Sequence, residues 1–68
     1  MYIVIELQTT GGQTANIVSS YSTLAEAESK FHAILSSAAI STVPVHAAAI
    51  LDDHGCILAN GAYEHGGE

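Results

Sequence analysis

Basic residues are almost absent from this sequence. Its 68 residues contain one lysine or arginine against seven aspartates and glutamates, which gives a formal net charge of −6. Proteins that bind nucleic acid or an anionic membrane surface need clustered lysine and arginine side chains to meet the phosphates. The sequence therefore predicts that the partner is neither a nucleic acid nor a membrane.

Cysteine is equally scarce, since Cys56 is the only one in the chain. A single cysteine excludes a disulfide within the chain, so a disulfide framework cannot support this small fold. The first residues carry Glu6 and lack the positively charged segment of a signal peptide. The apolar runs are too short to span a bilayer. Together these features predict a cytoplasmic protein.

Residue patterns for metal binding and catalysis are missing too. A metal site needs three or four converging ligands, and the histidines and Cys56 show no paired ligand spacing. Gly11 and Gly12 lack the GxxxxGK pattern of a phosphate-binding loop. No nucleophile, base and orienting group form a recognisable set. We expect no metal site, no cofactor and no catalytic residues, and the chain is not predicted to be an enzyme.

What the sequence does contain is one clear helix signal, within Tyr21–Ile40. Thr23 is followed three residues later by Glu26, which is the pattern of a capping box. An apolar stripe follows at helical spacing, with Phe31 expected at the centre of the core. Pro44 disfavours helix at the residue before it, so the helix should end near Ile40.

Four segments on either side of this helix are typical of strands. Apolar and polar residues alternate in them, and glycine-containing turns separate the members of each pair. The predicted strands are Tyr2–Thr9, Thr14–Ser20, Val45–Asp52 and Cys56–Tyr63, and Glu64–Glu68 should fray. The whole chain, residues 1–68, is therefore predicted to be one α+β domain of ββαββ order, with an antiparallel four-stranded sheet and the helix on one face.

Both faces of this sheet are apolar, and one helix covers only one of them. We expect the helix to cover Ile3, Ile5 and Leu7. The face predicted to remain uncovered carries Tyr2, Val4, Val18, His46, Ala48 and Ile50. With 49% hydrophobic residues and 12% charged residues, this second face is predicted to be buried by another copy of the chain. The sequence therefore predicts a homo-oligomer.

A few polar residues are candidates for a ligand site. Glu28 and His32 are neighbours on one edge of the helix, and Lys30 lies on the other edge. Histidine can donate to an anion or exchange protons near neutral pH, and lysine can meet a phosphate. The predicted ligand-binding residues are Lys30, His32, His46, Glu28 and Tyr2. The alternative interpretation makes Glu28 and His32 a solvated helix pair, Lys30 the partner of a nearby acid, and Tyr2 a boundary residue.

Two segments suggest a relationship. Residues 26–32, EAESKFH, and residues 43–46, VPVH, occur within an order that covers nearly the whole chain. They resemble a group of short uncharacterised proteins of Firmicutes and of their phages and prophages. The resemblance implies a phage or prophage context and assigns no catalytic residues.

Two functions fit these observations best, and a third, an enzyme using histidine and carboxylate for acid–base chemistry, ranks below them because no catalytic set is recognisable. In the first, a homo-oligomer sequesters a small anionic ligand, such as a nucleotide immune signal, as an anti-defence protein in the host cytoplasm. In the second, an accessory protein binds a host protein without any small ligand. The acidic balance suits a basic partner in the second case.

Overall fold

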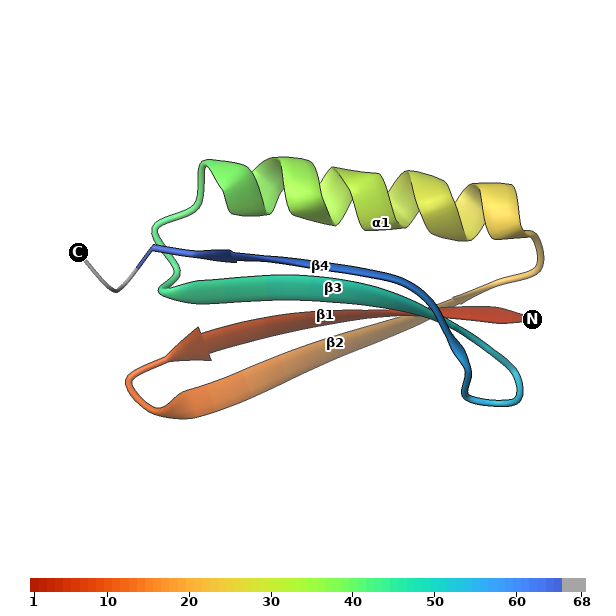
Figure 1. Ribbon diagram of the computed structural model, residues 1–68, viewed down its shortest axis with the longest axis horizontal. Helices are drawn as coiled ribbons and strands as arrows, with labels where there is room; N and C mark the ends of the chain where they lie inside the picture. The colour runs from red at the N-terminus through yellow and green to blue at the C-terminus, as the bar shows by residue number, and fades with distance from the viewer. Residues whose placement is uncertain (66–68) are drawn as a thin grey trace.

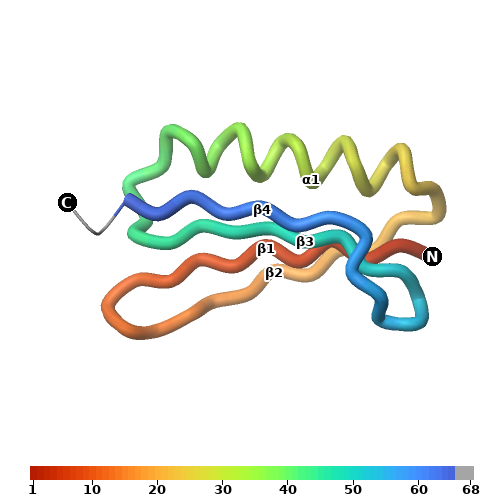
Figure 2. The backbone as a smooth tube through the Cα atoms, viewed as in Figure 1, coloured from red at the N-terminus to blue at the C-terminus, as the bar shows by residue number. Residues whose placement is uncertain are grey.

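The computed structural model describes residues 1–65, which form a four-stranded antiparallel sheet with one helix lying along one face (Figure 1). This arrangement confirms the predicted α+β fold, and the predicted strand bounds agree to within one residue. The two hairpin turns lie at opposite ends of the sheet (Figure 2). The elements are β1 (Tyr2–Thr10), β2 (Gln13–Tyr21), α1 (Leu24–Ala39), β3 (Val45–Asp52) and β4 (Ile57–Glu64).

The helix begins where the capping box predicts. The hydroxyl oxygen of Thr23 accepts a hydrogen bond from the backbone N–H of Glu26 at 3.2 Å, and the Thr23 hydroxyl donates to the Glu26 carboxylate at 3.0 Å. This cap satisfies one of the free N–H groups of the first turn and places a negative charge at the positive end of the helix dipole. The helix ends at Ala39, and the backbone N–H of its C-cap residue, Ile40, bonds back to the last turn.

The strands are arranged in the order β2-β1-β3-β4, so the first strand of the chain lies inside the sheet. Gly11 and Gly12 both have positive φ, at 62° and 80°, as a type I′ hairpin turn requires. From this turn β1 and β2 pair without interruption, from Thr10 opposite Gln13 to Tyr2 opposite Tyr21. The hairpin is therefore regular along its full length.

The end of the described chain is more ordered than predicted. Glu64 belongs to β4, opposite Val45, and the backbone N–H of His65 donates to the carbonyl of Pro44 at 2.7 Å. The His65 ring donates through Nε2 to the carbonyl of Ala38 at 2.8 Å, near the end of the helix. The prediction that fraying begins at Glu64 is therefore wrong for these two residues, and the rest of that segment lies outside the described residues.

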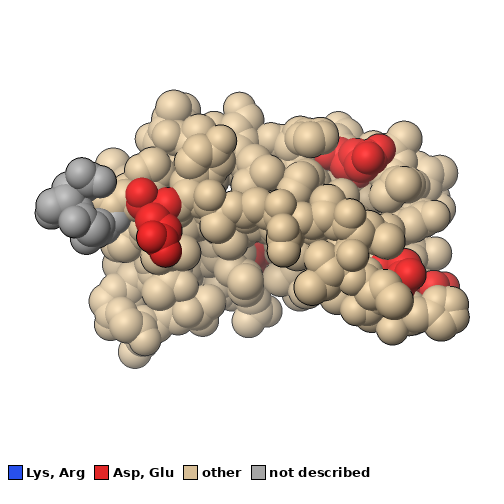
Figure 3. Space-filling model, in the orientation of Figure 1, with Lys and Arg blue, Asp and Glu red and all other residues tan. Residues whose placement is uncertain are grey.

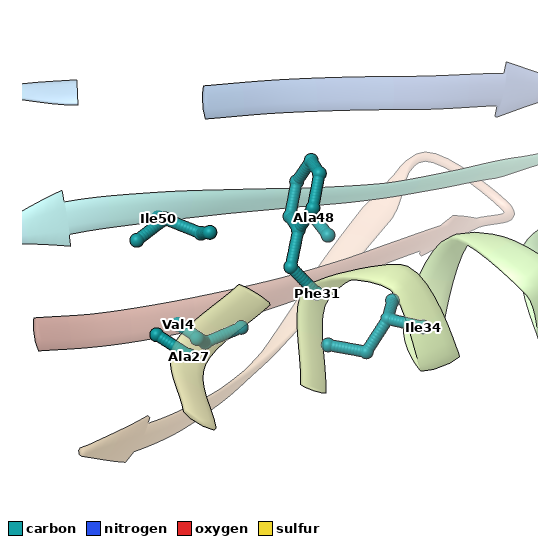
Figure 4. Close-up of a cluster of buried hydrophobic side chains, with 6 residues drawn as sticks. All are labelled: Val4, Ala27, Phe31, Ile34, Ala48 and Ile50. Atoms are coloured by element: carbon teal, nitrogen blue, oxygen red, sulfur yellow. The ribbon is translucent and has the colours of Figure 1, made fainter. Parts of the chain in front are cut away.

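The core lies between α1 and one face of the sheet (Figure 4). Phe31 projects from the helix toward Ala48, a small residue that leaves room for its ring. Gly61 leaves room for a different side chain, that of Leu35. A Cβ at position 61 would lie 3.0 Å from a methyl group of Leu35. The buried core residues are Val4, Ala27, Phe31, Ile34, Ala48 and Ile50.

The prediction of which face the helix covers is wrong. Directly opposite residues share a face, and Val4, which is 1% exposed, lies opposite Ile50 and packs with Phe31. The helix therefore covers Tyr2, Val4, His46, Ala48 and Ile50, whereas Ile3, Ile5 and Leu7 point away from it. Alternate residues of β1 form two sets, and the more apolar set, Ile3, Ile5 and Leu7, is the one expected in a core. The structure instead buries Glu6 beneath the helix, where His46 pairs with it.

We call the side of the sheet away from α1 the open face. It is composed of Ile3, Ile5, Leu7 and Thr9 of β1; Thr14, Asn16, Val18 and Ser20 of β2; Val45, Ala47, Ala49 and Leu51 of β3; and Ile57, Asn60, Ala62 and Glu64 of β4. Glu64, at one corner, is its only member with a formal charge among the described residues. In residues 1–65 no helix or strand covers this face (Figure 1).

Loss of the helix cap should lower the stability of the fold. We expect Thr23→Ala to reduce the free energy of unfolding by about 1 kcal/mol, because an N–H of the first turn loses its acceptor. Thermal unfolding followed by circular dichroism would measure this as a fall of about 4–8 °C in the Tm. Ser36→Ala, at an exposed position of the same helix, is the control and should leave the Tm nearly unchanged. Equal Tm values for the two variants would contradict the capping role of Thr23.

Candidate functional site

The sheet brings together two ionisable residues that are far apart in sequence. Glu6 lies on β1 opposite Ala48, and His46 lies on the same strand as Ala48, β3, two residues away, so the two side chains are diagonal neighbours on one face. Both side chains point toward the helix, and Nε2 of His46 donates to Oε2 of Glu6 at 2.6 Å. The His46 side chain is 6% exposed and that of Glu6 is 15% exposed. This is the most buried ion pair or charged hydrogen bond in the described part of the chain.

Further polar groups surround the Glu6 carboxylate. Burial raises the pKa of Glu6, but hydrogen bonds from His46 and Gln8, together with the positive charges of His46 and Lys30, bring that pKa below its ordinary value. The Gln8 side-chain amide donates to the same carboxylate oxygen at 3.0 Å. The carboxylate is therefore held in its charged form by neighbours on β1, β3 and α1.

The Glu6–His46 pair has a structural role in the fold, because each side chain compensates the burial of the other. Nδ1 of His46 is buried and has no hydrogen-bond partner among residues 1–65. Two surface hollows formed by the described residues lie on the open face and at the β1–β2 turn, and the second is bordered by Gln8, which donates to the Glu6 carboxylate. An acid–base role would need a reacting group within hydrogen-bond reach. The pair lies instead beneath the helix, where it compensates the burial of two polar side chains.

The structure does not bring the predicted ligand-binding residues together. Lys30 and His32 are two positions apart on the helix, about 200° around its axis, so they lie on opposite flanks. Lys30 lies on the flank facing Glu6, whereas the exposed His32 ring packs edge-on against Phe31, with a centroid distance of 5.4 Å. His46 is buried on β3, where it contacts Glu6. No ion pair or hydrogen bond joins Glu28 to His32 within the described chain.

Tyr2 is remote from the other predicted residues. It lies opposite Asp52 at one end of β1, whereas His46 lies opposite Gln8 near the other end. Six residues of extended strand separate these positions, a distance of about 20 Å. Tyr2 instead packs against the core beside Tyr21, as a boundary residue would. The five predicted residues therefore do not converge on one pocket in a single described chain.

Glu6 was missed as a site residue, although the sequence contains a signal for it. It is the one acid within an apolar strand, and His46 is the one basic group within another. Two groups of opposite charge in two buried strands are expected to pair, because an isolated buried charge is costly. That signal becomes specific only once the strand order places β1 beside β3.

One acidic cluster lies at the turn between β3 and β4. Ligand atoms of Asp52, Asp53 and His54 lie within 4.8 Å of one another. The Asp52 carboxylate already accepts backbone N–H groups of His54 at 2.9 Å and Cys56 at 3.0 Å. Both hydrogen bonds lower the pKa of Asp52, and the one from the backbone N–H of Cys56 has the larger effect. Turn formation thus accounts for the position of this carboxylate.

The open face is the largest feature without a structural role inside the chain. Its centre is a shallow hollow of about 350 Å³ over small side chains of β3 and β4, bordered by Leu7. Large apolar side chains stand at its periphery, with Val18 56% and Ile57 63% exposed. Contiguous apolar surface of this kind marks an interaction site on most proteins.

Comparison with known proteins gives no family assignment: no family model, curated protein or solved structure matches the chain. The resemblance to short phage and prophage proteins therefore stays a prediction. No helix within residues 1–65 has the length and apolar character needed to cross a membrane.

The Glu6–His46 pair should make stability depend on pH. The folded-state pKa of Glu6 is below its ordinary value of 4.5, so the unfolded chain takes up this proton first on acidification. Its stabilisation is therefore complete above about pH 5 and is lost as the pH falls through the lowered pKa. We expect Glu6→Gln to lower the free energy of unfolding at pH 7 by about 1–2 kcal/mol, because a charged hydrogen bond becomes neutral.

Urea unfolding between about pH 3 and pH 7 would measure both effects. The fall in stability toward acid pH should be smaller in Glu6→Gln than in the unchanged protein. Glu28→Gln removes the same charge from an exposed helix position and should keep the original pH dependence. If the two variants gave the same pH dependence, the Glu6–His46 pair would not be the source of it.

Proposed function

We propose that this protein is a protein-interaction module that works as a homo-oligomer, with its open face covered by a second copy. The open face carries this proposal, because its apolar side chains have no partner inside residues 1–65. A chain of this size has a small core of its own, in which Val4 and Ile50 are the largest fully buried side chains. Burying a second apolar layer would supply the stabilisation that small domains otherwise take from disulfides or metals.

The dimensions of the sheet are sufficient for such a contact. Four strands spaced about 4.8 Å apart and about eight residues long present roughly 500 Å² of sheet per copy. Two copies would bury about 1,000 Å² in total, which is the lower bound for a stable specific interface. The central hollow can accept large side chains of the facing copy, such as Leu7 or Ile57, so the surface is suited to packing on itself.

The surface left outside such an assembly is acidic. Acidic side chains lie at several separate places on the face shown in Figure 3, where no lysine or arginine is visible. The net charge of −6 per chain doubles in a dimer. A partner protein with a basic surface would be attracted to it at long range. This supports binding to a protein over binding to a small anion, which the same field would repel.

The positions of the sequence-predicted ligand residues also favour the protein-interaction function. His46 is engaged with Glu6, and Lys30 lies on the helix flank that faces the same carboxylate. An anionic ligand would have to compete with the Glu6 carboxylate for both side chains. Sequestration of a nucleotide signal would therefore need groups that one described chain does not assemble.

Native mass spectrometry of the purified protein tests this proposal. We expect a discrete oligomer with no additional small-molecule mass. Leu7→Lys places a charge in the centre of the open face and should halve the native mass while circular dichroism shows the fold retained. Leu7 is 37% exposed in the single chain, so the folded monomer accommodates lysine there.

Ile40→Lys is the matched control, because it makes the same type of change at a position that is 87% exposed on the end of the helix. It should keep the native mass of the unchanged protein. A monomeric unchanged protein, or a Leu7→Lys variant that keeps the full oligomer mass, would refute the role of the open face. A retained mass of a few hundred daltons would instead support a small ligand.

A further inference from the structure

The outer edge of β2 is unpaired and has none of the usual protection of a sheet edge. In the described chain, β2 pairs with β1 on one side only. Its nine residues, QTANIVSSY, contain no charged residue and no proline, and its pairing with β1 has no bulge. Natural edge strands avoid joining other strands by means of lysine, proline, bulges or short length. A long, neutral and regular edge is instead suited to receive another strand.

The opposite edge of the sheet, formed by β4, is different. Its pairing with β3 shifts register between Ile50 and Leu51, which marks a bulge. It also contains Gly61 and ends on the acidic Glu64. Bulges and inserted charge disfavour strand addition. The two edges therefore do not match each other, which disfavours an open-ended chain of sheets joined β2 to β4.

The hairpin geometry identifies the backbone groups that β2 presents outward. In a two-residue type I′ hairpin the residues flanking the turn, here Thr10 and Gln13, form a hydrogen-bonded pair, and such pairs then alternate along the ladder. The side chains of Thr9 and Thr14 meet at 2.8 Å between their Oγ1 atoms, as expected for the closer, non-hydrogen-bonded pair. The outward N–H and C=O groups on β2 are therefore those of Thr14, Asn16, Val18 and Ser20.

Side chains on both faces of β2 are also uncovered. Ile17, on the same face as the helix, is 55% exposed, and Val18, on the open face, is 56% exposed. β2 is drawn farther from α1 than the other strands are in Figure 1. Two adjacent β-branched side chains exposed on opposite faces are expected where a further strand continues the sheet.

We propose that the outer edge of β2 pairs antiparallel with the same edge of a second copy, with the two-fold axis at Ile17. In this register Asn16 faces Val18 of the second copy and Thr14 faces its Ser20. All four outward residues then exchange both of their backbone hydrogen bonds, and Ile17 meets its own copy in a close, non-hydrogen-bonded pair. The result is a continuous eight-stranded sheet with both helices on one side.

A second copy fits this edge better than a foreign strand does. Pairing about Ile17 is self-complementary, as a two-fold interface requires, and no charge of one copy faces a like charge of the other. The mismatch between the β2 and β4 edges favours closure at two copies. This inference rests on the proposed function in that the protein works as an oligomer, and it adds a contact that is separate from the open face.

Amide hydrogen exchange measured residue by residue with NMR tests the pairing directly. The amides of Asn16 and Val18 point into solvent in a single chain, so slow exchange there requires a partner strand. We expect these two amides to exchange about 100-fold more slowly than in an edge-disrupted variant. Rapid exchange of both amides in the unchanged protein would overturn the proposal. Leu7→Lys should leave their exchange slow, so failure of the open-face contact and failure of the edge contact can be distinguished.

Asn16→Pro is the edge-disrupted variant. It removes an outward N–H without removing a hydrogen bond to β1, and proline is accepted at such positions of edge strands. The native mass should be halved and exchange at Val18 accelerated. Asn60→Pro is the matched control, because it follows an alanine in the same way and lies on the β4 edge. It should keep slow exchange at Asn16 and Val18.

A second substitution tests the pairing if proline at position 16 prevents folding. Ile17→Lys would place two positive charges side by side at the two-fold axis, whereas one exposed lysine is harmless in a monomer. We expect the native mass to be halved, with Ile40→Lys again as the control. Retention of the full mass together with slow exchange at Asn16 and Val18 in the folded Ile17→Lys variant would overturn the axis at Ile17.

Discussion

A single helix can shield only one side of a four-stranded sheet, and this constraint governs the remaining features of the molecule. The helix packs Ala27, Phe31 and Ile34 onto the sheet residues Val4, Ala48 and Ile50, and these side chains form the buried core cluster. The other side of the same strands carries Ile3, Ile5 and Leu7, which are as apolar as the covered residues. In the described chain one of these two apolar layers stays exposed, which is unfavourable in water.

The choice of the covered side depends on a polar contact. The side of β1 beneath the helix contains Glu6 and Gln8, which are poor core residues alone. His46, forty residues further along the chain, compensates the Glu6 carboxylate at 2.6 Å, and Gln8 donates to the same oxygen. With these hydrogen bonds made, the less apolar side of β1 can be buried, and the more apolar side remains available for association between copies.

The parts of the fold that depend on neighbouring residues could be predicted from the sequence. The cap at Thr23, the turn at Gly11 and Gly12 and the alternation in each strand are set within a few residues, so the helix and all four strands were predicted. The covered side could not be predicted, because both alternations of β1 are apolar enough to form a core. The Glu6–His46 pair could not be predicted either, since it depends on β3 lying next to β1. The site of Lys30, His32 and His46 stays a prediction, because Lys30 and His32 lie on opposite flanks of the helix and one described chain does not bring them together.

The open face and the outer edge of β2 reinforce each other as association surfaces. Pairing about Ile17 would place the two open faces side by side in one plane and the two helices together on the other side. The apolar surface would then be doubled and continuous, so a contact through the open face would join paired chains and not single ones. In the proposed assembly both contacts would be closed by two-fold symmetry, and Glu64 is the one acidic side chain of the described residues that belongs to either contact surface. The acidic groups would thus remain outside, where their charge keeps the assembly from associating further.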